Sequence, residues 1–157
     1  METRIRVISI GIVVVAVAAA SLGFLGVRTR VTTQTTNGYT ITIAHAAVTR
    51  PGLATPFSLV VETADGSPLP AMTTVRVSAP YLAIFDDNGM EPQPVESYNT
   101  PEWTWWTFEV PTGEDRLQVV LDARLEPAVQ WGERAEAAVE IDGREVVAAD
   151  FSTWVMP

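Results

Sequence analysis

The feature that most constrains this chain is an apolar run over residues 7–27, which holds 21 residues and no charged side chain. A helix rises about 1.5 Å per residue, so the run would extend about 32 Å, close to the ~30 Å hydrocarbon core of a bilayer. Every backbone polar group in lipid must be satisfied within the segment, which favours a helix despite the many β-branched residues. The run therefore predicts a transmembrane helix, a signal anchor, behind a short cytoplasmic N-terminus at residues 1–6.

A cleaved signal peptide is the alternative interpretation of the same run. Small residues at positions 16–20 fit a cleavage site, and Arg4 and Arg6 supply the basic start. Against this, the run is longer than the usual apolar core of a signal peptide, which is about 7–15 residues. We favour the uncleaved anchor, and the cleaved form stays open.

The charge distribution bears on orientation and on partners. Two arginines stand on each side of the apolar run, so the count of flanking basic residues does not decide the orientation. Residues 31–157 contain six Arg, no Lys and eighteen Asp or Glu, a net charge of −12. A long segment translocates largely regardless of charge, so we expect this part to be extracytoplasmic, at the cell membrane. Its charge predicts repulsion from nucleic acid, which is excluded as a partner, and from anionic lipid headgroups.

The C-terminal part has the length of one domain. We expect a short polar linker at residues 28–37 and a folded domain at residues 38–157, long enough to bury a core. The chain contains no cysteine, so no disulfide stabilises it, and thiol chemistry and most structural zinc sites are excluded.

Alternation of apolar and polar residues recurs from Tyr39 onward and indicates strands. The Asp142–Gly143 pair between two such segments is a strong hairpin signal. With turn signals every 8–15 residues, the pattern predicts an all-β fold: an immunoglobulin-like antiparallel β-sandwich of seven or eight strands behind the helix. The segments that carry the pattern are 39–45, 57–62, 73–78, 103–110, 116–125, 135–141 and 145–155.

One oxygen-rich stretch is a candidate calcium site. Asp86, Asn88 and Glu91 could donate oxygen ligands, with a sharp bend at Gly89. The spacing does not match the twelve-residue EF-hand loop, and Asn–Gly is a common turn former. We favour a plain turn over a calcium site.

The aromatic segment 103–110 offers a candidate binding surface. In a strand, Trp106, Phe108 and Val110 share one face and look like core, while Trp103 and Trp105 share the other. The outer pair either forms an exposed binding surface or is covered by the proline-rich segment 91–101, because large exposed aromatic patches are uncommon on monomers.

Catalysis has few candidate residues. His45 is the single histidine, and we expect it to be partly buried near the end of a strand. No cysteine, Gly-rich phosphate loop or nucleophile-elbow serine is present, so we expect no cofactor and no enzymatic activity. A carboxylate pair could still converge in space, as in a glycosidase.

Four stretches carry a resemblance: residues 47–56, 81–89, 122–127 and 155–157. They resemble an uncharacterised group of single-pass, membrane-anchored envelope proteins of high-GC Gram-positive (actinobacterial) bacteria. The resemblance spans most of residues 38–157, and the absence of Lys agrees with that source. It implies a localisation in the envelope and carries no site residues.

Three functions follow in order of preference. The first is a membrane-tethered binding or accessory module that packs on a membrane or cell-envelope protein. The second is a module that binds a carbohydrate or peptidoglycan fragment through Trp103 and Trp105, because flat aromatic rings suit sugar stacking. The third, least favoured, is a carboxylate-dependent hydrolase.

Overall fold

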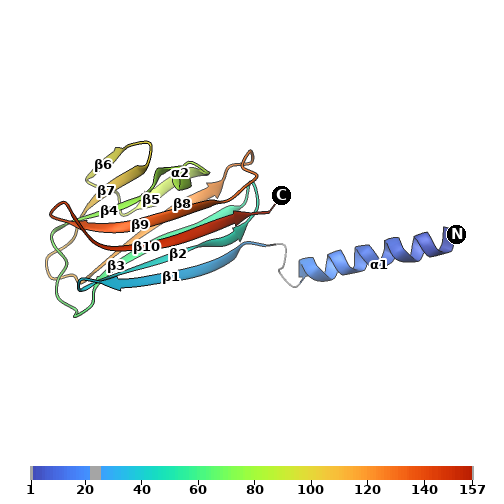
Figure 1. The fold of residues 1–157 in the computed structure, drawn as a ribbon, viewed down its shortest axis with the longest axis horizontal. Helices are drawn as coiled ribbons and strands as arrows, with labels where there is room; N and C mark the ends of the chain where they lie inside the picture. Colours follow the sequence, from blue (N-terminus) through green and yellow to red (C-terminus); the bar gives the residue numbers. More distant parts are fainter. Residues whose placement is uncertain (1, 22–25, 157) are drawn as a thin grey trace.

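A computed structural model describes residues 2–21 and 26–156 of the chain, with α1 (Glu2–Ser21) separated in sequence from a β-rich domain (Figure 1). A short helix, α2 (Ala79–Leu82), interrupts the strands. The strands are β1 (Arg28–Thr36), β2 (Tyr39–Thr49), β3 (Ala54–Thr63), β4 (Met72–Ser78), β5 (Phe85–Glu91), β6 (Glu96–Asn99), β7 (Trp103–Glu109), β8 (Arg116–Leu125), β9 (Glu133–Ile141) and β10 (Arg144–Val155).

Helix α1 contains much of the apolar run, and its apolar side chains are exposed, among them Ile8, Ile12 and Val15. The run continues past Ser21 into residues 22–25, which lie outside the described residues. In the described part of the chain, no helix combines the length and the apolar character needed to cross a membrane. The transmembrane helix therefore stays a prediction.

The ten strands of the described chain form one mixed sheet in the order β5-β8-β3-β2-β10-β9-β4-β7-β6, with β1 paired to β2. All neighbours are antiparallel except β2 and β10, which run parallel where Val48 pairs with Trp154 and Thr49 with Val155. The expectation of a purely antiparallel sheet is wrong at this point. The pairing of β2 with β3 ends at His45, and the remaining end of β2 meets the last residues of β10.

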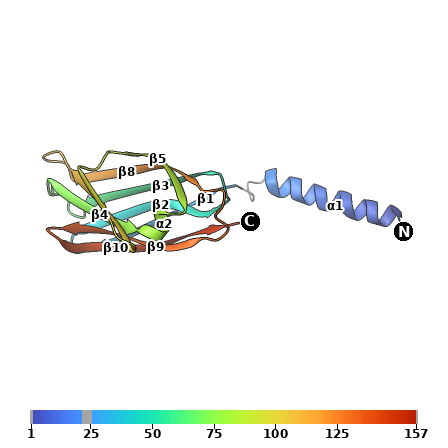
Figure 2. The same cartoon turned by 90° about the horizontal axis from the view of Figure 1, so that it is seen from above.

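The sheet curls so that its two halves share one core. In Figure 2, β3 and β8 lie along one side and β9 and β10 along the other. Phe57 from one half and Val139 from the other belong to the same buried apolar cluster. Tyr81 of α2 is fully buried in this cluster, contacts the rings of Phe57, Phe85 and Phe151, and shares a hydrogen bond of 3.1 Å with the Thr153 hydroxyl. The all-β prediction is confirmed.

Three strands that the sequence did not predict, β1, β5 and β6, raise the number of described strands to ten, where seven or eight were expected. Residues 28–37, expected to be a linker, instead form β1 and a tight turn in which Asn37 and Gly38 adopt positive φ angles of 51° and 80°. Strand β1 has no apolar alternation because it lies exposed at the edge, where threonine hydroxyls pair across to β2. Strands β5 and β6 fall in segments expected to be a turn and a loop.

Candidate functional site

The two outer tryptophans lie on the face of β7 that points away from the core. Trp106 and Phe108 are buried in the core, whereas Trp103 and Trp105 are half-buried on the opposite side of the strand. The predicted division of β7 into two faces is therefore confirmed. It follows from the two-residue period of a strand, which needs no tertiary information.

Arg76 on β4 is the side chain that organises this outer surface. Its backbone pairs with Trp105 in the β4–β7 ladder, and its guanidinium carbon lies 4.3 Å above the ring of Trp103. A cation in this position is attracted to the electron-rich face of the indole. Arg76 therefore covers one face of a tryptophan that the sequence left as a candidate open platform.

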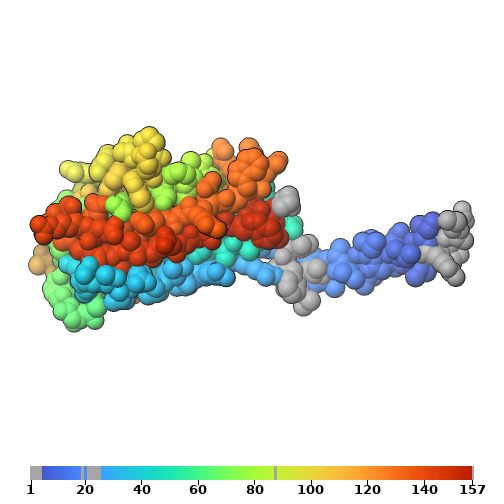
Figure 3. Space-filling view, viewed as in Figure 1, coloured from blue at the N-terminus to red at the C-terminus, as the bar shows by residue number. Residues whose placement is uncertain are grey.

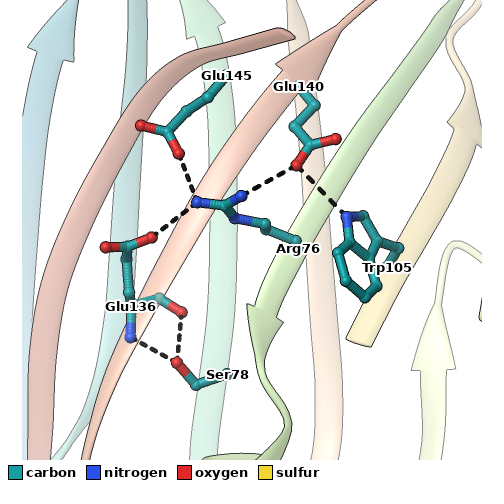
Figure 4. Close-up of polar contacts among 6 residues, drawn as sticks. All are labelled: Arg76, Ser78, Trp105, Glu136, Glu140 and Glu145. Atoms are coloured by element: carbon teal, nitrogen blue, oxygen red, sulfur yellow. Dashed lines mark hydrogen bonds and ion pairs between the residues drawn. The ribbon is translucent and has the colours of Figure 1, made fainter. Parts of the chain in front are cut away.

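Three carboxylates surround the Arg76 guanidinium, as Figure 4 shows. Glu136 pairs with it at 3.0 Å, Glu140 at 3.3 Å, and Glu145 from the neighbouring strand β10 makes a third ion pair. The Arg76 side chain keeps 19% of its exposure, and its Nε atom has no hydrogen-bond partner among the described residues. One positive and three negative charges give the cluster a formal charge of −2.

The side chain that lies beneath Arg76 on the sheet is that of Ala138. Ala138 pairs with Arg76 in the β4–β9 ladder, is fully buried, and does not belong to the core cluster. Since the neighbouring residues Ala137 and Val139 point into the core, Ala138 lies on the outer face beneath the arginine. Its small side chain leaves room for the guanidinium to lie across the sheet.

The short strand β6 covers the second tryptophan. Tyr98 pairs with Trp105 in the β6–β7 ladder, and the two rings stack 4.4 Å apart with their planes 6° from parallel. Trp105 also donates its indole N–H to Glu140 Oε1 at 3.4 Å. Segment 91–101 therefore does cover part of the tryptophan pair, but as a strand that adds an aromatic ring of its own, 58% exposed.

We call these seven residues the aromatic face: Arg76, Tyr98, Trp103, Trp105, Glu136, Glu140 and Glu145. Ser78 fixes one edge of it. Its hydroxyl accepts the Glu136 N–H at 2.9 Å and donates to the Glu136 carbonyl at 3.2 Å (Figure 4). These two bonds continue the contact between β4 and β9 beyond the last backbone pair, Val77 with Ala137.

The candidate calcium ligands do not lie in a turn. Asp86, Asn88 and Glu91 belong to β5, which pairs with β8 across a bulge between Asp87 and Gly89. The favoured interpretation of this stretch as a plain turn is therefore wrong. Hydropathy could not reveal the strand, because β5 is irregular and contains few apolar residues. Among the residues that the structure describes, no group of three His, Cys, Asp or Glu side chains is placed to hold a metal ion.

Two titratable side chains, His45 and Tyr81, are buried inside the fold. His45 is buried, with hydrogen-bond contacts from its ring to the Thr32 hydroxyl at 3.4 Å and the Ala46 carbonyl at 3.3 Å. Burial lowers the pKa of His45 below its ordinary value of 6.5, and burial raises the pKa of Tyr81 to about 12. His45 was expected to be partly buried near the end of a strand; it is instead almost fully buried and lies within β2, which continues to Thr49.

Comparisons with known proteins add little to this geometry. No family model matches the sequence, and no curated protein sequence matches it. Among solved structures, the chain is similar to the N-terminal domain of the Streptococcus gordonii adhesin Sgo0707, with a TM-score of 0.49 and 7% sequence identity. The match covers 68% of this chain and 29% of the adhesin chain. A likeness at this level carries no argument about function.

Proposed function

We propose that the chain is a non-catalytic, extracytoplasmic binding module that engages a protein of the membrane or cell envelope through its aromatic face. The observation that carries this proposal is the stack of Tyr98 on Trp105, which leaves an exposed aromatic ring beside a network of partly buried charges. Rigid aromatic side chains and arginine are the residue types that dominate the binding energy of protein interfaces.

We further propose an immunoglobulin-like sandwich as the architecture. The division of the curled sheet into two facing halves supports this architecture. One half consists of β1, β2, β3, β8 and β5, and the other of β10, β9, β4, β7 and β6. The parallel contact between the end of β2 and β10 joins them at one corner. Sandwiches of this kind present their outer sheet faces and end loops to partners.

The proposed location rests on composition and on the apolar run. Residues 7–27 would serve as the anchor, and the absence of cysteine excludes a lipid-modified cysteine in its place. The acidic, lysine-free domain suits export, as does the resemblance to actinobacterial envelope proteins.

A glycan is the second candidate ligand, and Tyr98 is the residue that favours it. Arg76 covers one face of Trp103, and Tyr98 covers one face of Trp105, so the predicted tryptophan platform is occupied on those sides. A sugar ring would therefore stack on the exposed Tyr98 rather than on the tryptophan pair.

The carboxylates of the aromatic face favour a structural role over hydrolysis. Glycosidases need one protonated and one ionised carboxyl group on either side of a scissile bond. Here the Arg76 guanidinium occupies the space between Glu136, Glu140 and Glu145 and pairs with all three. We therefore place the hydrolase last.

Site-specific photo-crosslinking in cells tests the proposed face. A photoreactive residue at position 98 should give a discrete adduct, while the same residue at exposed position 120, on β8, should not. Equal labelling at both positions would contradict a specific face. Binding of purified chain to a glycan array, lost in Tyr98→Ser at a temperature where that variant is still folded by circular dichroism, would select the glycan instead.

A further inference from the structure

Two tryptophans outside the aromatic face are the most exposed aromatic side chains of the domain. Trp131, between β8 and β9, is 72% exposed, and Trp154, near the end of β10, is 60% exposed. Gly132 packs against the backbone of β10, since a Cβ atom there would lie 1.8 Å from the Thr153 carbonyl oxygen and 2.7 Å from Trp154 Cα. This close approach puts the two tryptophans on adjoining stretches of backbone.

The same end of the domain receives the chain from α1. Val48 pairs with Trp154 on β10 and also with Arg28, the first residue of β1. Only residues 22–27 separate Ser21 from Arg28, and six residues can extend at most about 20 Å. Figure 3 shows the red atoms of β10 running along the domain and reaching the end nearest α1.

Charge is unevenly distributed along the domain. Arg28, Arg30, Arg50 and Arg134 lie at the end near Trp154, as the pairings of β1, β2 and β10 place them. The opposite end is strongly acidic, with Arg116 and Arg144 outnumbered. Its acidic residues are Glu62, Asp65, Glu109, Glu114, Asp115, Asp142 and Glu145. The seven acidic residues and two arginines of the far end have a net charge of −5, whereas at the end near Trp154 the arginines lie among Asp86, Glu126 and Glu133, so that end is closer to neutral.

We propose that this end of the domain docks on the bilayer, with Trp131 and Trp154 in the headgroup region and the arginines near lipid phosphates. Tryptophan prefers this zone because its ring is apolar and its N–H is polar, and guanidinium groups pair with phosphate in a bidentate manner. The proposal rests on the anchoring of residues 7–27 and names the bilayer as the partner of this surface. It differs from the expectation, drawn from net charge, that the whole domain is repelled by anionic headgroups.

Quenching of tryptophan fluorescence by brominated lipids tests the docking. All five tryptophans lie after residue 102, so the helix contributes no signal. The full chain is reconstituted into phosphatidylcholine–phosphatidylglycerol vesicles with and without brominated chains. We expect quenching in the original chain and loss of most of it in Trp131→Phe with Trp154→Phe. The matched control, Trp103→Phe with Trp105→Phe, removes as many tryptophans and should keep the quenching.

Flotation of the same vesicles separates the two proposals. Protein that floats with the vesicles after carbonate washing but shows no quenching has kept its anchor, and this result would overturn the docking. A second copy or another protein that covers these tryptophans would give the same result and would also overturn it. Quenching that survives in the Trp131 and Trp154 double variant also overturns it. Protein that does not float overturns the anchor and the docking together.

Discussion

Tyr98 and Trp105 are backbone neighbours on β6 and β7 and stack with their ring planes 6° apart. Strand β6 has four residues, all exposed, and within the described part of the chain it pairs with β7 alone. A strand this short has little other means of attachment, so the stack is the main side-chain contact that keeps it on the sheet.

A double-mutant cycle measures that contact. Tyr98→Ala and Trp105→Ala should each destabilise the chain, and the double variant should lose less than their sum by about 0.5–1.5 kcal/mol, the coupling typical of aromatic pairs. Urea-induced unfolding of the four proteins provides the free energies. Strict additivity would mean that the two rings do not interact in solution.

Arg76 should matter far more than an exposed arginine. Arg76→Met leaves three partly buried carboxylates without their cation and removes the contact with Trp103, and we expect a loss of about 2 kcal/mol in the free energy of unfolding. Arg116→Met breaks one exposed pair, with Glu62 at 2.9 Å, and should cost under about 1 kcal/mol. Equal losses from these two variants, measured in urea at the same ionic strength, would show that the network has no special role.

His45 makes stability depend on pH. Burial is the main reason that its pKa is lower in the folded chain than the ordinary value of 6.5, and Arg30, its backbone partner on β1, adds repulsion. The unfolded chain then binds a proton that the folded chain does not. The contribution is complete above about pH 6.5 and is lost as the pH falls from there through the folded pKa, by up to ~1.4 kcal/mol per pH unit.

Comparison with His45→Gln isolates this effect from the carboxylates. The original chain should lose more stability than the variant between about pH 7.5 and about pH 5.5, because the carboxylates titrate alike in both. Parallel loss in the two proteins, measured by urea unfolding, would mean that His45 takes up its proton without disturbing the fold.

Gly132 tests the contact between the segment joining β8 to β9, which carries Trp131, and the last residues of β10, which carry Trp154. Gly132→Ala places a methyl group within 1.8 Å of the Thr153 carbonyl oxygen, so backbone must move, and we expect a loss of about 1–3 kcal/mol. Gly11→Ala is the control, since a Cβ atom there meets none of the described residues within 4 Å. A melting temperature unchanged by both substitutions would show that this loop is not held against β10.

The parts of the fold that the sequence predicts well are those decided by local alternation. Strand β8 alternates between exposed and buried residues along its whole length, as its pattern of leucine, valine and charged residues predicts. The Asp142–Gly143 hairpin forms with both residues at positive φ. In these segments the residues adjacent in the sequence are sufficient to predict the local structure.

Edge strands escaped prediction because hydrogen bonding, rather than burial, keeps them in the sheet. Strand β1 is almost entirely exposed, so its threonines show no hydrophobic period. The turn that joins it to β2 is Asn37–Gly38, with both residues at positive φ. The aromatic face is similar. Alternation identified Trp103 and Trp105, but Arg76 and Tyr98 join them through pairings between strands, which local patterns do not encode.

The pairing of β1 with β2 also determines how the domain responds to force. Strand β1 enters the sheet at Arg28 and runs antiparallel to β2 as far as the turn that joins them, so a pull applied from the helix side acts along the strand axis. The ladder bonds lie across that axis and share the load simultaneously, rather than opening one after another as in unzipping. Resistance to rupture then reflects the barrier to unfolding and not the equilibrium stability of the chain. An exposed, threonine-rich strand with little part in the core thus becomes the mechanical clamp between the N-terminal segment and whatever the domain holds.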